Sequence, residues 1–119
     1  MRRELRLRSS RRFSQIHQEG RSWANSYLVL KVLSNGADKT LFGLVTTRRL
    51  GGAVVRNKIR RRLREILRDA PVKVGWDLVF IARKRKEVPR FNDLKGAAHN
   101  LLHRAKLLEI TNLPRKSEN

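Results

Sequence analysis

The sequence has no cysteine, only three prolines and only ten acidic residues among its 119 residues. The lack of cysteine excludes disulfides, thiolate zinc ligands and thiol nucleophiles, and it fits a reducing compartment. No run of about 18 uncharged apolar residues is present, so we expect no membrane-spanning helix. The amino-terminal stretch MRRELRLRSSRR also lacks the apolar core of a signal peptide. We therefore expect a soluble, cytoplasmic protein.

The few acidic residues are outnumbered by 29 lysines and arginines, which gives a formal net charge of +19. Such an excess destabilises the compact chain through self-repulsion unless a polyanion neutralises it. A membrane surface is one candidate polyanion, but basic membrane-binding segments usually keep an apolar face for lipid, and here the core needs the apolar stripes. Nucleic acid is the favoured partner. The excess of arginine over lysine suits bidentate contacts to phosphate.

The chain length suits a single domain, because 119 residues leave no room for a second hydrophobic core. We expect one nucleic-acid-binding domain over residues 1–119, with an ordered core over about 5–110 and a disordered tail over 111–119. Periodicity, caps and turn signals predict six elements. In chain order they are a helix over 9–20, a strand over 26–34, a strand over 41–47, a helix over 53–69, a strand over 76–83 and a helix over 92–108.

The signals that bound these elements also predict how they pack. Ser9 and Ser10 are candidate caps of the first helix, and Gly20 is its natural stop. The pair Asn35-Gly36 predicts a tight turn, so the first two strands are expected to form an antiparallel hairpin. The continuous apolar run WDLVFIAR is expected to lie inside the sheet. The order α-β-β-α-β-α is typical of an α+β fold, with the helices packed on one face of a small sheet.

Two helices have clear apolar faces. In the basic helix over 53–69, the stripe consists of Val55, Ile59, Leu63, Ile66 and Leu67. In the last helix, it consists of Leu94, Ala98, Leu101, Leu102 and Ala105. Asn92 or its neighbour is the candidate cap of the last helix. Burial of the first stripe directs the remaining side chains of the basic helix outward.

The basic helix carries six arginines and one lysine between positions 56 and 68, with only Glu65 and Asp69 at helical spacing to compensate them. Ordinary solvated helices alternate acidic and basic residues, because like charges four residues apart repel. The alternative is a merely solvated charged face, which this pattern disfavours. The segment is therefore expected to bind an external polyanion.

The stretch GGAVVRNKIRRRLREILR resembles the signature of the protein subunit of bacterial ribonuclease P. The first helix with Phe13, the pair Ala24-Asn25 and the stretch DLVFIARK follow in the order of that family, so the resemblance covers about residues 5–108. It implies an α/β sandwich with a mixed sheet and a left-handed βαβ crossover. It also implies a protein that assists endonucleolytic removal of the 5′ leader of precursor tRNA. The partners would be the catalytic RNA, which performs the hydrolysis with Mg²⁺, and the precursor tRNA.

The resemblance implies two sets of site residues and no catalytic or metal-binding side chain on the protein. The residues expected to bind the catalytic RNA are Arg56, Asn57, Arg60, Arg61, Arg64 and Arg68. Those expected to form a cleft for the single-stranded leader are Phe13, His17, Tyr27, Val29 and Lys31. A ring beside a cationic groove binds single strands without reading their sequence. The chain departs from the family at Gly52, often Asn, at His17, often a second aromatic, and at Lys58, usually Arg.

Other functional classes have weaker support in the residues. Glu65 and Asp69 are surrounded by arginines, which favours counterions over a catalytic metal site. His99 and His103 have the spacing of a zinc pair, but no third ligand lies nearby in sequence. A ribosomal or RNA-chaperone protein would share the basic helix and would lack a leader cleft. A DNA-binding module would need a recognition helix packed on a companion helix.

The two tryptophans could stack on bases. Trp23 and Trp76 both flank predicted strands. Large aromatic side chains in such positions are more often part of the core. We therefore expect core packing for both.

Overall fold

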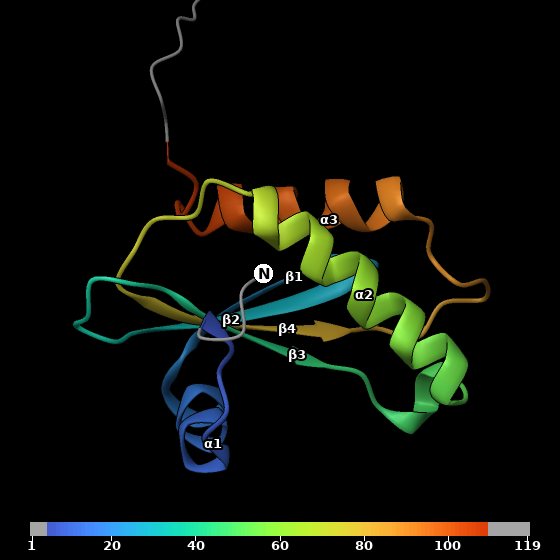
Figure 1. Cartoon of the computed structure of the whole chain (residues 1–119), viewed down its shortest axis with the longest axis horizontal. Helices are drawn as coiled ribbons and strands as arrows, with labels where there is room; N and C mark the ends of the chain where they lie inside the picture. The colour runs from blue at the N-terminus through green and yellow to red at the C-terminus, as the bar shows by residue number, and fades with distance from the viewer. Residues whose placement is uncertain (1–4, 110–119) are drawn as a thin grey trace, which may run out of the picture.

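The computed structural model describes residues 5–109 as a four-stranded sheet with helices on both faces (Figure 1). The predicted tail over 111–119 lies outside the described residues. The elements are α1 Ser10–Glu19, β1 Arg21–Ala24, β2 Leu28–Ser34, β3 Leu41–Val45, the 3-10 helix η2 Arg48–Leu50, α2 Ala53–Asp69, β4 Trp76–Ala82 and α3 Phe91–Arg104. The order is α-β-β-β-α-β-α, an α+β fold.

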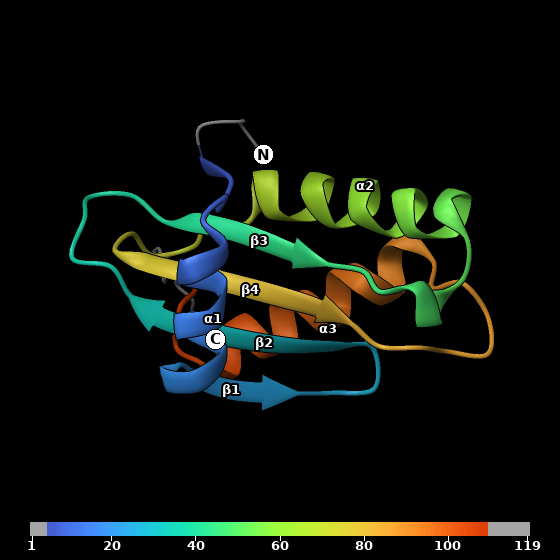
Figure 2. The ribbon, with the colours of Figure 1, turned by 90° about the horizontal axis from the view of Figure 1, so that it is seen from below.

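The sheet has the strand order β1-β2-β4-β3. β1 and β2 are antiparallel, β2 and β4 are antiparallel, and β3 and β4 are parallel, so the sheet is mixed (Figure 2). Figure 2 looks onto the sheet from the α1 side, with β3 and β4 running in the same direction and α2 on the far side. The β3-α2-β4 crossover is left-handed, as the family resemblance implies and against the general right-handed preference.

The predicted hairpin between the strands over 26–34 and 41–47, which correspond to β2 and β3, is wrong. The chain does turn at Asn35-Gly36, where Asn35 Oδ1 accepts a hydrogen bond from the Ala37 amide and Gly36 has a φ of 67°. However, β2 and β3 do not pair, because β4 lies between them. β4 takes this place because its apolar run is buried on both faces of the sheet. The prediction that this run lies inside the sheet is confirmed.

Strand β1 was not predicted. Its sequence, RSWA, has one large apolar side chain, and three of its four residues are exposed. It pairs with β2, where Trp23 lies opposite Leu30. Tertiary pairing with an adjacent strand therefore creates an element that alternation alone does not reveal.

The prediction that all helices pack on one face is also wrong, because α1 lies on the opposite face from α2 and α3 (Figure 1). Alternation along the strands produces two apolar faces. The main core lies between the sheet and the helices α2 and α3 and includes Leu30, Leu63, Phe80 and Leu101. A smaller cluster under α1 is formed by Leu7, Ile16 and Val79. The short α1 covers only part of its face of the sheet.

Local signals set the helix ends largely as expected. Ser9 Oγ accepts a hydrogen bond from the Arg12 amide at 3.2 Å and caps α1, which ends before Gly20. Helix α2 spans Ala53–Asp69 as predicted, with a buried stripe in which only Val55 stays half-buried. The buried face of α3 holds four of its five expected residues, and Ala105 lies just past the helix end.

The start of α3 and the two tryptophans complete the comparison with the sequence. Helix α3 begins after Arg90, whose amide donates to Asp93 Oδ2 at 3.2 Å, so Asn92 is not the cap. Trp23 and Trp76 both pack against the main core, as expected.

Candidate nucleic-acid interface

Five arginines of α2 and Asn57 form two neighbouring rows on the side of the helix away from the core. We call these six residues the basic ridge. One row is half-buried and the other is exposed. The half-buried row is Arg56, Arg60 and Arg64, and the exposed row is Asn57, Arg61 and Arg68. Because Ile59, Leu63, Ile66 and Leu67 are buried, the rotation of the helix is fixed and the six predicted residues share one surface.

Two side chains show that this surface is organised. Arg60 donates hydrogen bonds to Thr46 Oγ1, just after β3, and to Asn57 Oδ1. Asn57 therefore orients Arg60 from within the ridge. Arg62 behaves differently, because it donates to the carbonyl oxygen of Pro89 in the β4-α3 loop. Burial of the apolar stripe was expected to direct all seven cations of this helix outward, and this is wrong for Arg62.

The ridge is electrostatically strained in the free protein. Partial burial lowers the pKa of Arg64, and the nearby positive charges of Arg6 and Arg60 lower it further. Compensation on the helix is weak, since Arg68 contacts Asp69 at 3.6 Å and both side chains are largely exposed. Nε of Arg56 is buried and has no hydrogen-bond partner among the described residues. An anion placed here would relieve repulsion and satisfy donors together.

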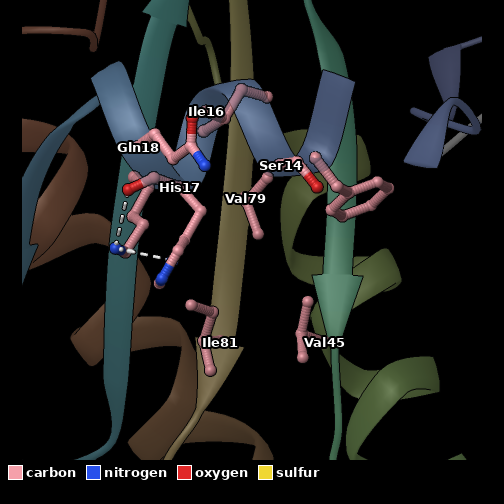
Figure 3. A pocket seen from close by; sticks show the side chains of 9 residues that line it. Ser14, Ile16, His17, Gln18, Val45, Val79 and Ile81 are labelled. Carbon is pink, nitrogen blue, oxygen red and sulfur yellow. Dashed lines mark hydrogen bonds between the residues drawn. The ribbon is translucent and has the colours of Figure 1, made fainter. Parts of the chain in front are cut away.

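A groove on the opposite face of the sheet forms the second candidate surface (Figure 3). It has a volume of about 400 Å³. The residues that line it, from α1 and from three strands, are Phe13, Ser14, Ile16, His17, Gln18, Lys31, Val45, Val79 and Ile81. Figure 3 shows Val45, Val79 and Ile81 on the strands that lie beside α1. Apolar side chains and an aromatic ring thus form most of the lining, with one cation at the side.

The cation and the imidazole of the groove contact each other. Lys31 Nζ lies 3.0 Å from His17 Nδ1 and 3.5 Å from the His17 carbonyl oxygen. Because an ammonium can only donate, Lys31 is the donor in both contacts. The pair adds polar groups to a groove whose lining is mostly apolar.

The position of α1 over the sheet is fixed by an ion pair between a half-buried arginine and a buried aspartate. Arg12 Nε donates to Asp77 Oδ2 at 2.6 Å, and Arg12 Nη2 donates to the Ser34 carbonyl at 2.9 Å. Asp77 is 3% exposed and also accepts from Asn35 Nδ2 at 2.9 Å. These bonds join the helix to β4 and to the turn after β2. These hydrogen bonds therefore hold α1 against the strands that line the groove.

The structure brings together three of the five residues predicted for the cleft. Phe13, His17 and Lys31 line the groove. Val29 lies next to Ile81 in the sheet register, on the same strand face as Lys31, but is not part of the lining. Tyr27 lies elsewhere, with its ring 4.4 Å from the Arg85 guanidinium carbon.

Tyr27 lies away from the groove because the chain turns just before β2. Asn25 Oδ1 accepts hydrogen bonds from the amides of Tyr27 and Leu28, so Tyr27 precedes the regular strand. Sequence reasoning also missed Val79 and Ile81, which form the floor. The alternation along β4 could have identified them, because Val79 and Ile81 alternate with Leu78 and Phe80, which are buried in the main core on the other face.

The other candidate sites lack the groups that chemistry would require. No group of three or more His, Cys, Asp or Glu residues that could hold a metal ion occurs within residues 5–109. Glu65 and His103 are exposed, and His99 is half-buried. Over the same part of the chain, no helix is long and apolar enough to cross a membrane.

Comparison with known proteins identifies the family. The family model described as Ribonuclease P matches residues 1–106. The protein is 38% identical over 114 residues to the ribonuclease P protein component of Roseiflexus sp. (strain RS-1), with 93% of each chain covered. It is 35% identical over 101 residues to that of Clostridioides difficile (strain 630), covering 82% of this chain and 89% of the relative.

Solved structures give the same result. The structure of the Staphylococcus aureus RNase P protein matches with a TM-score of 0.79 at 27% identity, covering 88% of this chain and 98% of that one. The RNase P protein from Thermotoga maritima matches with a TM-score of 0.76 at 38% identity, covering 83% and 96%. The fold, the basic ridge and the sequence matches agree, and the chain belongs to the ribonuclease P protein family.

Proposed function

We propose that this protein, as the protein subunit of ribonuclease P, binds the catalytic RNA through the basic ridge and the 5′ leader of precursor tRNA through the groove. In this way it assists endonucleolytic removal of the leader. The observation that carries the proposal is the arrangement of two different surfaces around one sheet. A charged ridge suits the phosphates of a folded RNA, and an apolar groove with a ring suits unstacked bases.

The ridge has the properties that a folded RNA partner requires. Arg60 is held by two hydrogen bonds on a packed helix, so little of its side-chain entropy is lost on binding. The planar forks of the ridge arginines can each contact a phosphate through two N–H groups. The lowered pKa of Arg64 supports a role for an anion here, because the anion would offset the repulsion among neighbouring cations.

The groove suits a single strand and not a duplex. Phe13 offers an aromatic ring for stacking, and Val45, Val79 and Ile81 offer an apolar floor. Lys31 supplies a positive charge for the backbone, while the lining includes no carboxylate. Such a site distinguishes a tRNA that carries a leader from one that does not, with little dependence on the leader sequence.

We assign the hydrolysis to the RNA partner, with Mg²⁺ bound there. Phosphodiester hydrolysis needs an activated water and stabilisation of developing negative charge, commonly through metal ions held by clustered carboxylates. The donor set within residues 5–109 does not fit such a centre. We expect the complex to act in the cytoplasm. The alternative of a ribosomal or RNA-chaperone protein has no support in the comparisons.

The proposal is tested by adding the purified protein to a bacterial ribonuclease P RNA at low Mg²⁺ and measuring leader removal. The protein should stimulate cleavage, and the complex should bind precursor tRNA more tightly than mature tRNA. Equal affinity for the two tRNAs, together with no stimulation, would reject the proposed function.

A further inference from the structure

A small basic pocket lies beside the groove, between the amino-terminal segment, β3 and α2. It has a volume of about 140 Å³, and three of its lining residues are Arg6, Arg60 and Arg64, which we call the three-arginine pocket. Arg60 and Arg64 belong to the basic ridge. Arg6 was not predicted as a site residue, because it lies outside every predicted helix and strand. It also precedes Arg60 and Arg64 by more than 50 positions in the chain.

Main-chain pairing brings Arg6 to this position. Arg6 forms a parallel bridge with Phe42, and the amide of Leu7 donates to the Phe42 carbonyl at 2.8 Å. The amino-terminal segment thus pairs with the edge of the sheet at β3. Leu7 is 8% exposed and belongs to the small cluster under α1, so the pairing is fixed by packing as well.

The described lining of the pocket is strongly cationic. Eight residues of the described range 5–109 line it, and none of these eight is aspartate or glutamate. Nε of Arg6 is buried and has no hydrogen-bond partner among the described residues. Arg60 is held by Thr46 and Asn57 through part of its five-donor fork, which leaves further N–H groups for a ligand. The lowered pKa of Arg64, caused by burial and then by Arg6 and Arg60, agrees with this crowding of cations.

The pocket and the groove share one residue. Phe13 lines both, with Ile16 and His17 on the groove side and Arg6 on the pocket side. An RNA strand whose base stacks on the Phe13 ring would therefore carry its backbone close to the pocket. The pocket is small and cationic, so its size and charge suit a single phosphate group and not a base.

We propose that the three-arginine pocket binds one backbone phosphate of the single-stranded RNA that occupies the groove. This inference rests on the proposed function of the groove. It adds Arg6, which the basic ridge does not include, and it assigns Arg60 and Arg64 to the leader, which leaves Arg56, Asn57, Arg61 and Arg68 of the ridge to the catalytic RNA. The phosphate would accept hydrogen bonds from guanidinium groups of two elements, the amino-terminal segment and α2. The leader would then be held by stacking on one side of Phe13 and by charge on the other.

The test uses the reconstituted holoenzyme and precursor tRNAs that carry one uncharged methylphosphonate linkage at successive leader positions. With the unchanged protein, one linkage should weaken precursor binding on the order of tenfold, since a hydrogen-bonded charge contact is lost. In Arg6→Gln, the same linkage should have little further effect, because its partner is already absent. The matched control is Arg8→Gln, an exposed arginine of the same segment that does not line the pocket, and it should keep the full penalty.

Arg64→Gln provides a second variant from another element, and it should also abolish the penalty at that same linkage. The inference is overturned if Arg6→Gln and Arg64→Gln keep the full penalty, if no linkage matters, or if Arg6→Gln weakens only the binding of the catalytic RNA. Phe13→Ala separates this failure from failure of the proposed function. If Phe13→Ala lowers precursor affinity while Arg6→Gln keeps the penalty, the pocket inference alone fails.

Discussion

The ring of Phe13 lies directly over the backbone of Gly43 in β3. A Cβ atom built on Gly43 would lie 2.6 Å from Phe13 Cζ and 2.7 Å from Cε1, which is closer than carbon atoms can approach. The absence of a side chain at position 43 therefore lets the ring rest against the sheet. This contact fixes the one aromatic side chain that lines both the groove and the three-arginine pocket.

Replacing Gly43 with valine should push the Phe13 ring out of place. We expect a loss of about 1–3 kcal/mol in the free energy of unfolding, because overpacking forces neighbouring atoms to shift. Precursor affinity should fall as well, while affinity for the catalytic RNA changes little. Denaturant unfolding and binding titrations measure these effects, and an unchanged precursor affinity would show that the ring position does not matter.

Gly96 offers a matched glycine in a different setting. It lies exposed within α3, and an added Cβ would meet no atom within 4 Å. Gly96→Ala should therefore raise the free energy of unfolding by roughly 0.5–1 kcal/mol, because alanine restricts the unfolded chain and favours the helix. RNA binding should stay the same. Destabilisation in the same unfolding experiment would contradict the assigned exposure.

The ion pair between Arg12 and Asp77 should be important for stability. Asp77→Ala leaves the donors of Arg12 and Asn35 without their acceptor in a buried setting, and we expect a cost of about 2–4 kcal/mol. Leader binding should weaken too, because α1 loses its link to β4. Arg11→Ala, an exposed change on the same helix, serves as the control, and equal stability losses for the two variants would refute the assignment.

The sequence predicts local features of this fold better than its pairing. The apolar stripe of α2, the cap at Ser9 and the stop at Gly20 act within a few residues, so periodicity and turn chemistry reveal them. The partner of β2 does not follow from such signals. The turn at Asn35-Gly36 suggests a hairpin, and only the burial of β4 on both faces explains why that strand separates β2 from β3.

The candidate sites also differ in this way, because local features of the sequence predict one of them and long-range pairing forms the others. The basic ridge lies on one helix, so helical spacing places its residues on one surface, while the family resemblance implied which of them bind RNA. The groove and the three-arginine pocket combine residues from distant elements. Tyr27 was misplaced because a side-chain-capped turn at Asn25 precedes the strand, and Arg6 was missed because a single bridge to β3 carries it to α2. Long-range pairing of this kind is not encoded in any local pattern.

The two faces of α2 should respond differently to truncation. Leu63 is completely buried, so Leu63→Ala should cost about 2–5 kcal/mol in the free energy of unfolding. Arg61 is exposed, so Arg61→Ala should leave that free energy within about 0.5 kcal/mol. It should instead weaken binding of the catalytic RNA. Circular dichroism during thermal unfolding distinguishes the two, and unfolding of Arg61→Ala would mean that the outward face is wrongly assigned.

The net charge of +19 predicts that salt affects the free protein and its complex in opposite ways. Screening reduces repulsion among the cations, so the free protein should unfold at higher denaturant concentration as salt increases. Binding of the catalytic RNA should weaken, with a log-log slope of roughly −0.7 to −0.9 for each phosphate contacted. Unfolding titrations and filter binding across a salt series check both, and a slope near zero would refute electrostatic binding.

The most direct measurement compares two variants of the holoenzyme in two binding experiments. Phe13→Ala should lower the affinity for precursor tRNA relative to mature tRNA and leave the affinity for the catalytic RNA unchanged. The double variant Arg61→Ala with Arg68→Ala should lower the affinity for the catalytic RNA and keep the preference for precursor. If each variant lowers both affinities to the same extent, the groove and the basic ridge do not bind separate parts of the RNA.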